Sequence, residues 1–373
     1  MEITVSDNTN KRIVIKIGSS SLTSLHGEVS RRKLERLTDE IAQLKDEGHE
    51  VILVSSGAVA AGYRKLGCLT RPDSLPEKQA AASIGQGLLM EAYSELFMSH
   101  GYVASQILIT RSDFSDEKRY GNARNTLHVL MERGIIPIVN ENDTVTIDRL
   151  RFGDNDTLSA KVAALVDADQ LIILSDIDGL YTDNPMVNPE ATLVEKVTEI
   201  TEEIEASAGT AGSSVGTGGM KSKIDAFKIA MASGIPSFLG KAGTPNILLD
   251  AVNGDAKGTY FDSEEEIINL NQKKRWIAFN SGPQGTVVVN EIGEHTLKEK
   301  ETPIYAKEII HFEGRFKKGD VVRIFTPNQE EIGLGVIMID SESLAGKDIA
   351  QEEPIMVRDE LVCHQDMSVS ITG

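Results

Sequence analysis

Residues 12–18 read RIVIKIG, and residues 50–57 read EVILVSSG. Each is a short apolar run that ends in a glycine or serine turn and is followed by a helical pattern. Five further runs occur up to residue 262: YVASQILIT (102–110), GIIPIVNEND (134–143), QLIILSDIDG (170–179) and, less clearly, GIPSFLG (234–240) and TPNILL (244–249). Strands that are buried on both faces have this appearance. The pattern predicts an α/β domain, a three-layer αβα sandwich with a mainly parallel central sheet.

The texture of the chain changes after residue 262. A polar stretch, DSEEEIINLNQKKRW, is followed by short alternating pieces such as GTVVVNE, KGDVVRIF and LGVIMID. Alternation of this kind is typical of small β domains. We therefore expect an α/β domain over residues 1–262, a linker over 263–276 and a small β-rich domain over 277–373.

The composition restricts the function classes. The chain has 373 residues, two cysteines and a formal charge of −19. Two cysteines far apart support neither a disulfide framework nor a zinc site, and the sequence has no signal-type or membrane-length apolar segment. We expect a cytoplasmic protein that contacts no membrane. The negative charge argues against nucleic-acid binding, which depends on lysine and arginine.

The first strand contains a lysine where a buried residue is expected. Lys16 interrupts the run RIVIKI just before Gly18. Burying an ammonium group costs several kcal/mol unless the group is paired. Ligands of such sheets bind beyond the carboxyl ends of the strands. Lys16 is therefore expected to have an acidic partner or a ligand, although a lysine reaching out from an edge strand is the alternative.

Polar residues follow the next strands. Ser55, Ser56 and Gly57 precede an alanine-rich helix, where a serine can cap the helix or help to seat an anion. The fourth run ends in NEND at 140–143, and DNDT at 154–157 opens the next helix. Carboxylates and amides at this density suit an ammonium group, the ordering of lysines, or magnesium.

The fifth run ends in Ser175 and Asp176. The DIDG that follows is not an EF-hand loop, because Val187 stands where the twelfth-position glutamate is needed. Ser175 and Asp176 are placed to contact a nucleotide.

The stretch GTGGMKSKIDA at 216–226 is glycine-rich and leads into a helical pattern. It is neither a Walker A loop, which needs Gly-Lys-Ser/Thr in succession, nor a complete dinucleotide fingerprint. A glycine run before a helix can still bind an anion, and a flexible surface loop is the alternative. The strand ends together offer lysines, glycine loops and acids without a Ser/His/Asp constellation, which favours phosphoryl transfer by charge neutralisation.

Five motifs together resemble the amino acid kinase family: KIGSS, SSGAV, NEND with FGDNDTLSA, SDIDGLYTDNP and GTGGMKSK. They cover residues 11–262 in the family's order. Within the family they are most similar to the members that phosphorylate the side-chain carboxylate of glutamate, the first step of proline biosynthesis. The C-terminal segment, with FKKGDVV and VRDELV, resembles a PUA domain.

The resemblance implies the following roles. Lys16 and Lys223 would stabilise the transferring phosphoryl group, Asp156 would orient both lysines, and Gly18 with neighbouring N–H groups would help to receive it. The residues implied to bind glutamate are Ser56, Gly57, Asn140, Asp143 and Asn155. The residues implied to hold ATP are Lys16, Ser175, Asp176, Thr217, Gly218, Gly219, Met220, Lys221, Ser222 and Lys223.

The resemblance also implies ATP as co-substrate and Mg²⁺, with no protein ligand assigned to the metal. It further implies feedback inhibition by proline, a homodimer or homotetramer, and delivery of the product to glutamyl phosphate reductase. Two alternatives stay open. One is a sibling kinase acting on aspartate, acetylglutamate, carbamate or UMP; the other is an RNA-binding or regulatory protein that keeps the kinase fold.

Overall fold

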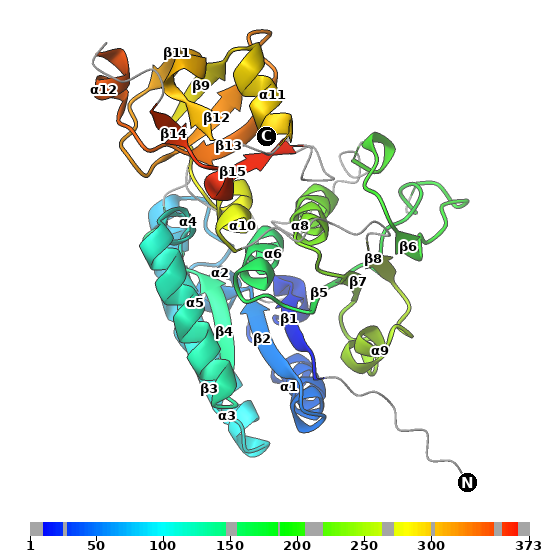
Figure 1. Cartoon of the computed structure of the whole chain (residues 1–373). Coiled ribbons are helices and arrows are strands. Elements are labelled where there is room, and N and C mark those ends of the chain that lie inside the picture. The colour runs from blue at the N-terminus through cyan, green and yellow to red at the C-terminus, as the bar shows by residue number, and fades with distance from the viewer. Residues whose placement is uncertain are drawn as a thin grey trace. The chain divides into compact units, whose positions relative to one another are not determined.

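The computed structural model describes residues 10–24, 28–146, 155–185, 187–205, 219–262, 272–299, 303–346 and 353–364. The chain divides into two compact units (Figure 1). The larger contains Met1–Asp113 and Lys118–Glu264, and the smaller contains Phe114–Glu117 and Glu265–Gly373. Helix α10 (Gln272–Phe279) begins within the predicted linker, whose residues 263–271 lie outside the described ranges. The domain boundaries at 262 and 277 stay predictions.

The larger unit is built on a sheet whose described strands number eight, in the order β3-β4-β2-β1-β5-β7-β8-β6. Neighbours are parallel except β7 and β8, which are antiparallel. The strands are β1 (Arg12–Ile17), β2 (Glu50–Ser55), β3 (Ala104–Ile109), β4 (Ile136–Glu141), β5 (Gln170–Ser175), β6 (Lys196–Val197), β7 (Ser237–Lys241) and β8 (Thr259–Phe261). The predicted mainly parallel sheet is confirmed, and β1 lies in its middle.

Helices cover both faces of this sheet. The helices of the larger unit and of its boundary are α1 (Arg31–Asp46), α2 (Ala58–Gly62), α3 (Leu75–Ser99), α4 (Arg111–Ser115), α5 (Glu117–Glu132), α6 (Asn155–Leu165), α8 (Met220–Ala232) and α9 (Ile247–Asn253). Alternate residues of β1 point to opposite faces. Ile15 and Ile17 pack in one cluster with residues of α1, α3 and α9, whereas Lys16 meets Asp156 of α6 on the other face. The three predicted layers are therefore present.

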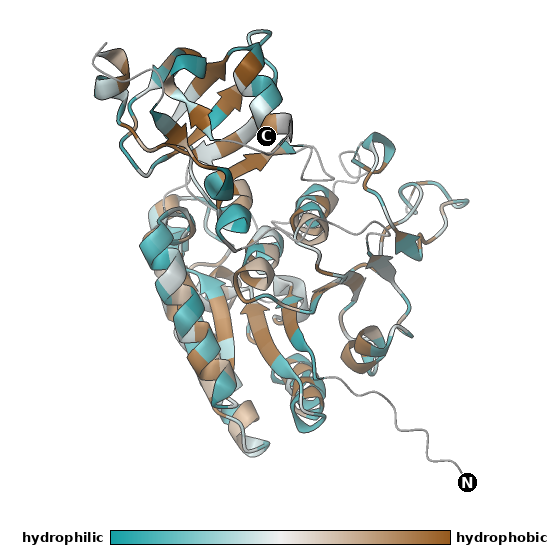
Figure 2. Cartoon of the chain, viewed as in Figure 1, coloured by the Kyte–Doolittle hydropathy of each residue, from teal (hydrophilic) through white to brown (hydrophobic). Residues whose placement is uncertain are grey.

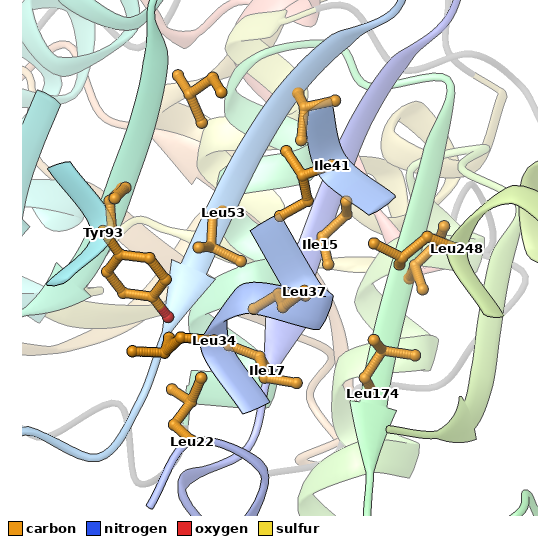
Figure 3. Close-up of a cluster of buried hydrophobic side chains, with 14 of the residues drawn as sticks. Ile15, Ile17, Leu22, Leu34, Leu37, Ile41, Leu53, Tyr93, Leu174 and Leu248 are labelled. Carbon is orange, nitrogen blue, oxygen red and sulfur yellow. The ribbon is translucent and has the colours of Figure 1, made fainter. Parts of the chain in front are cut away.

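The core on the α1 side explains why the strand runs are almost continuously apolar. Ile15, Ile17 and Leu53 of the sheet lie against Leu34, Leu37 and Ile41 of α1 (Figure 3). All six side chains are buried. In Figure 2 strands β2 and β4 are brown along most of their length, whereas α5 carries both colours. Burial of these aliphatic side chains contributes roughly 1.5–3 kcal/mol each to folding, relative to leaving them exposed.

One predicted strand is a helix. TPNILL at 244–249 is wrong as a strand, because Ile247–Asn253 form α9. The helix begins after Asn246, whose φ is 59°, and ends at Gly254, whose φ is 86°. Ile247, Leu248 and Leu249 are buried, and so are Ala251 and Val252. A short apolar run is compatible with either element, and here the mostly buried helix produces it.

The smaller unit is β-rich, as predicted. Its described strands form a five-stranded sheet in the order β11-β9-β12-β13-β15 and a two-stranded sheet, β10-β14. The strands are β9 (Gly285–Val289), β10 (Ile304–Tyr305), β11 (Ile309–Gly314), β12 (Val321–Phe325), β13 (Glu331–Val336), β14 (Pro354–Met356) and β15 (Leu361–Cys363), with helices α11 (Glu291–Glu299) and α12 (Ser341–Ala345). Within the described ranges of the chain, no helix is long and apolar enough to cross a membrane.

Helices α2 and α3 approach so closely that only glycine fits at their contact. A Cβ built on Gly62 would lie 1.9 Å from the carbonyl oxygen of Ala81, and one on Gly85 would lie 1.8 Å from that of Ala58. In both cases the obstructing atom belongs to the backbone, so no side-chain movement can relieve the clash. This contact holds α2, and with it the turn after β2, against α3.

We therefore expect Gly85→Ala to lower the free energy of unfolding by about 3 kcal/mol or more. Gly87→Ala is the matched control, since Gly87 lies two residues further along the same helix. Among the residues that the structure describes, a Cβ there meets nothing within 4 Å. That control should be neutral or stabilise by roughly 0.5–1 kcal/mol, because alanine is the better helix former. Urea unfolding of both variants measures the difference, and equal midpoints would contradict the close contact.

Candidate active site

One carboxylate forms ion pairs with two lysines near the carboxyl end of the central strand β1. Asp156 Oδ1 lies 2.5 Å from Lys16 Nζ, and Asp156 Oδ2 lies 3.1 Å from Lys223 Nζ. Lys16 and Lys223 are 4% exposed and Asp156 is 0% exposed. Lys16 comes from β1, Asp156 from the first turn of α6 and Lys223 from the first turn of α8. We call these three residues the ion triad.

The sequence favours each of these positions. Lys16 sits on a central strand, not on an edge strand, so it needs the buried partner that its position predicted. The helix dipole of α6 favours a carboxylate in its first turn. The helix begins at Asn155, which places Asp156 at that point.

The charge of Asp156 is maintained by the lysines. Burial raises the pKa of this carboxyl. The positive charges of Lys16 and Lys223 lower it by more than burial raises it, so the pKa of Asp156 lies below the ordinary value. Asp156 is therefore ionised at neutral pH. The ion triad carries a formal charge of one positive unit, which a buried anion can neutralise.

Next to the ion triad, the side chain of Asn155 joins Ser55, Ser56 and Asn140, and we call these four residues the amide hub. Asn155 Nδ2 donates to the Ser55 carbonyl at 2.6 Å, to Ser56 Oγ at 3.0 Å and to Asn140 Oδ1 at 2.9 Å. The ends of β2 and β4 and the start of α6 therefore meet at one side chain. Asp143 lies in the turn after β4 and is half-buried. The structure thus brings together Ser56, Asn140 and Asn155 of the predicted glutamate-binding set.

The turn after β2 differs from the simple capping interpretation. Gly57, not a serine, occupies the N-cap position of α2, and no side chain caps that helix. Its φ is 95°, a conformation that glycine adopts without strain. Ser55 Oγ instead lies 3.0 Å from Tyr93 OH of α3, and burial raises the pKa of that hydroxyl. Ser56 is turned toward Asn155.

Apart from Lys16 on β1, the described residues predicted to hold ATP lie at the end of β5 and the start of α8. Ser175 Oγ donates to Asp176 Oδ1 at 3.0 Å. Ser222 Oγ donates to Asp156 Oδ2 at 3.1 Å and to the Gly219 carbonyl at 2.8 Å. Lys221 is exposed, and Met220 opens the helix. Thr217 and Gly218 lie outside the described residues.

Gly18 lies directly beside Lys16. Its N–H donates to the Leu174 carbonyl at 3.2 Å, so this donor already serves the junction of β1 and β5. A Cβ on Gly18 would stand 4.0 Å from Lys16 Nζ. Glycine at this position therefore places no side-chain atom of its own next to that ammonium group.

Three contacts of the site were not predicted. Ser222 reaches Asp156, Tyr93 reaches Ser55, and Gln86 of α3 accepts a hydrogen bond from Asn140 Nδ2 at 2.9 Å. Gln86 and Tyr93 belong to a long helix that carries no motif. No cluster of three or more His, Cys, Asp or Glu side chains that could hold a metal occurs among the residues described.

Comparison with known proteins agrees with this arrangement. Residues 11–241 match the amino acid kinase family, and residues 285–352 match the PUA domain. A carbamate kinase from Giardia lamblia bound to AMP-PNP has a similar fold, with a TM-score of 0.50 at 18% identity over 69% of this chain and 100% of that one. The chain belongs to the amino acid kinase family.

Within that family, three relatives that are similar over nearly their full length are glutamate 5-kinases. Glutamate 5-kinase 2 of Bacillus licheniformis is 62% identical over 98% of this chain and 100% of its own length. Glutamate 5-kinase 2 of Bacillus subtilis is 60% identical over 98% and 99%. Glutamate 5-kinase of Neisseria meningitidis is 43% identical over 97% of this chain and 96% of its own length.

Proposed function

We propose that this chain transfers the γ-phosphoryl group of ATP to the side-chain carboxylate of L-glutamate, giving L-glutamyl 5-phosphate for proline biosynthesis. The single observation that carries the proposal is the ion triad, in which one carboxylate holds two buried lysines from β1 and α8. The full-length similarity to glutamate 5-kinases supports the same substrate.

The acceptor needs no general base. A glutamate side chain has a pKa of about 4.3 and is already ionised at pH 7. The obstacle is repulsion between the attacking carboxylate and the phosphates. At an effective dielectric constant near 20, two unit charges roughly 4 Å apart repel by about 4 kcal/mol. Lys16 and Lys223 would offset this repulsion, since they carry one more positive charge than Asp156 neutralises.

The geometry favours simultaneous action of the two lysines. Asp156 binds one ammonium group with each of its oxygens, which fixes the two cations relative to each other before substrate arrives. Such preorganisation stabilises developing charge without reorganisation during the reaction. Glutamate would lie beside the amide hub, with Asp143 and Asn155 facing its ammonium group and Ser56 a carboxylate.

ATP would lie over the ends of β5 and α8. Ser175 ends β5 and Asp176 follows it, and the N–H groups in the first turn of α8, which have no partner within the helix, would favour the phosphates. Mg²⁺ would enter with ATP, because kinase sites commonly bind it through the substrate phosphates and one or two carboxylates. When bound, it would supply further positive charge to the phosphates.

Several partners are proposed on the family resemblance alone. They are proline as feedback inhibitor, a homodimer or homotetramer, and glutamyl phosphate reductase as acceptor of the product. Cytoplasmic location belongs with them. The PUA domain is not assigned a nucleic acid, because residues 280–373 carry 9 basic residues against 17 acidic ones.

Purified protein should form ADP in the presence of L-glutamate, ATP and Mg²⁺, and hydroxylamine should trap the labile acyl phosphate as the hydroxamate. Aspartate, acetylglutamate, carbamate and UMP serve as parallel substrates in the same coupled assay. Turnover with aspartate or UMP and none with glutamate would reject the proposal. Absence of turnover with every substrate would instead favour a regulatory protein with a kinase fold.

A further inference from the structure

We propose that Gln86, on helix α3, is a positioning residue for the amino-acid substrate: it orients the amide of Asn140 and, through it, Asn155 and Ser56. This inference rests on the proposed function and adds to it a residue outside the family motifs. It is carried by a continuous chain of hydrogen bonds between side chains.

The series of hydrogen bonds starts at a backbone donor. The N–H of Glu141 donates to Asn140 Oδ1 at 2.9 Å. An N–H group can only donate, so the amide of Asn140 must present its oxygen there. Its nitrogen then faces α3, where Asn140 Nδ2 donates to Gln86 Oε1 at 2.9 Å. Gln86 must in turn present its oxygen, and its Nε2 donates to Gln106 Oε1 at 3.1 Å.

The same logic continues toward the substrate side. Asn140 Oδ1 also accepts from Asn155 Nδ2, whose other acceptors are the Ser55 carbonyl and Ser56 Oγ. The nitrogen of Asn155 is therefore directed at the protein, and its oxygen is directed away from these three acceptors. Ser56 accepts through its oxygen, which leaves its own hydrogen to donate elsewhere.

The result is one acceptor and one donor with fixed polarity. Asn155 Oδ1 can accept from an ammonium group, and the Ser56 hydroxyl can donate to a carboxylate. A free α-amino acid carries both groups. If Asn140 turned its amide over, Asn155 would face a donor where it now meets an acceptor, and the polarity of the whole chain would be lost.

Among these hydrogen-bonded residues, Gln86 is the one best suited to fix the orientation of the amides. Asn140 is only 2% exposed, so water cannot easily replace a lost partner of its Nδ2. Gln86 is half-buried and Gln106 is exposed, so Gln106 can rotate its amide into water at low cost. The acceptor oxygen of Gln86 therefore matters for the site, and its donor nitrogen does not.

The test is a set of variants at Gln86 assayed for both substrates. We expect Gln86→Leu to raise KM for glutamate roughly tenfold, the usual effect of leaving a buried donor unpaired, with KM for ATP within about twofold of the parent. Gln86→Met, which keeps the length of the side chain, should behave likewise. Gln86→Glu keeps the acceptor oxygen for Asn140 and should restore KM for glutamate to near the parent value.

Gln43→Leu on α1 is the control, because Gln43 is exposed and its side-chain amide donates to Glu47 Oε1, on the same helix boundary, at 3.4 Å. An unchanged KM for glutamate in Gln86→Leu and Gln86→Met would overturn the inference. So would equal defects in Gln86→Leu and Gln86→Glu, since a packing role alone would give that result. The parent protein distinguishes failure of the proposed function from failure of the role of Gln86. If the parent does not phosphorylate glutamate, the proposed function is wrong. If the parent does so and the variants match it, only the role of Gln86 is wrong.

Discussion

Replacing Lys223 by alanine is expected to lower kcat by roughly 10²- to 10³-fold, the usual cost of removing one preorganised charge-stabilising group. The fold should survive, because Asp156 keeps its ion pair with Lys16 at 2.5 Å. The remaining pair is formally neutral, so no buried charge is left without a partner. Steady-state kinetics and thermal unfolding on the same preparation measure the two effects.

Lys228→Ala is the matched control for this variant. Lys228 lies on the same helix and is ion-paired with Glu205, away from the ion triad. It should turn over at nearly the parental rate. A Lys223→Ala protein with near-normal kcat would remove this lysine from phosphoryl transfer. A higher KM for ATP with an unchanged kcat would limit its role to ground-state binding.

Asp156→Asn should lower both turnover and stability. The substitution keeps the shape of the side chain but leaves two lysines, each 4% exposed, without their carboxylate. Removing one partner of a buried ion pair costs about 3–5 kcal/mol. Because the two cations repel each other, the transfer rate should fall by a factor similar to that for Lys223→Ala. Urea unfolding and kcat are the measurements.

The pH dependence has a definite sign. The folded-state pKa of Asp156 lies below its unfolded value, so the ionised carboxylate contributes stability that is present above the unfolded pKa. That contribution is lost as the pH falls through the lower, folded-state pKa. The parent protein should therefore lose stability in acid more steeply than Asp156→Asn does.

Asp167→Asn is the control for Asp156→Asn. Asp167 pairs with Arg124 at 2.6 Å but has a side chain that is 35% exposed. Such a pair contributes about 0–1 kcal/mol. A second measurement uses added nucleotide. Its polyphosphate should stabilise Asp156→Asn more than it stabilises the parent, since it supplies the missing negative charge. Equal stabilisation would argue against contact between nucleotide and the ion triad.

Much of the fold could be predicted because burial on two faces leaves a clear pattern. The run around Lys16 predicted a buried strand and the need of that lysine for a partner or a ligand, and the structure places Asp156 against it. The same reasoning was wrong for TPNILL, since a buried seven-residue helix and a buried strand produce similar apolar runs.

The supporting residues could not be predicted for a different reason. Gln86 and Tyr93 lie on α3, which is 25 residues long and has no local signal beyond helical periodicity. Their contacts depend on where α3 lies against the other elements, and its close approach to α2 requires glycine at both Gly62 and Gly85. A pattern in the sequence shows which residues are apolar, not which two helices approach closely. The placement of Phe114–Glu117 in the smaller unit likewise depends on tertiary contacts.

The position of β1 has a consequence for synthesis on the ribosome. Strand β1 precedes the other strands that the structure describes, yet it occupies the middle of the finished sheet, and it carries the lysine that is buried beside Asp156 and Lys223. Its neighbours β2 and β5 are separated along the chain by α3, α5 and α6. A nascent chain that ends before α6 lacks the Asp156 carboxylate that pairs with Lys16, so the burial of Lys16 in β1 is less stable at that stage. The larger unit therefore has to complete its fold late in translation, once both α6 and β5 have left the exit tunnel.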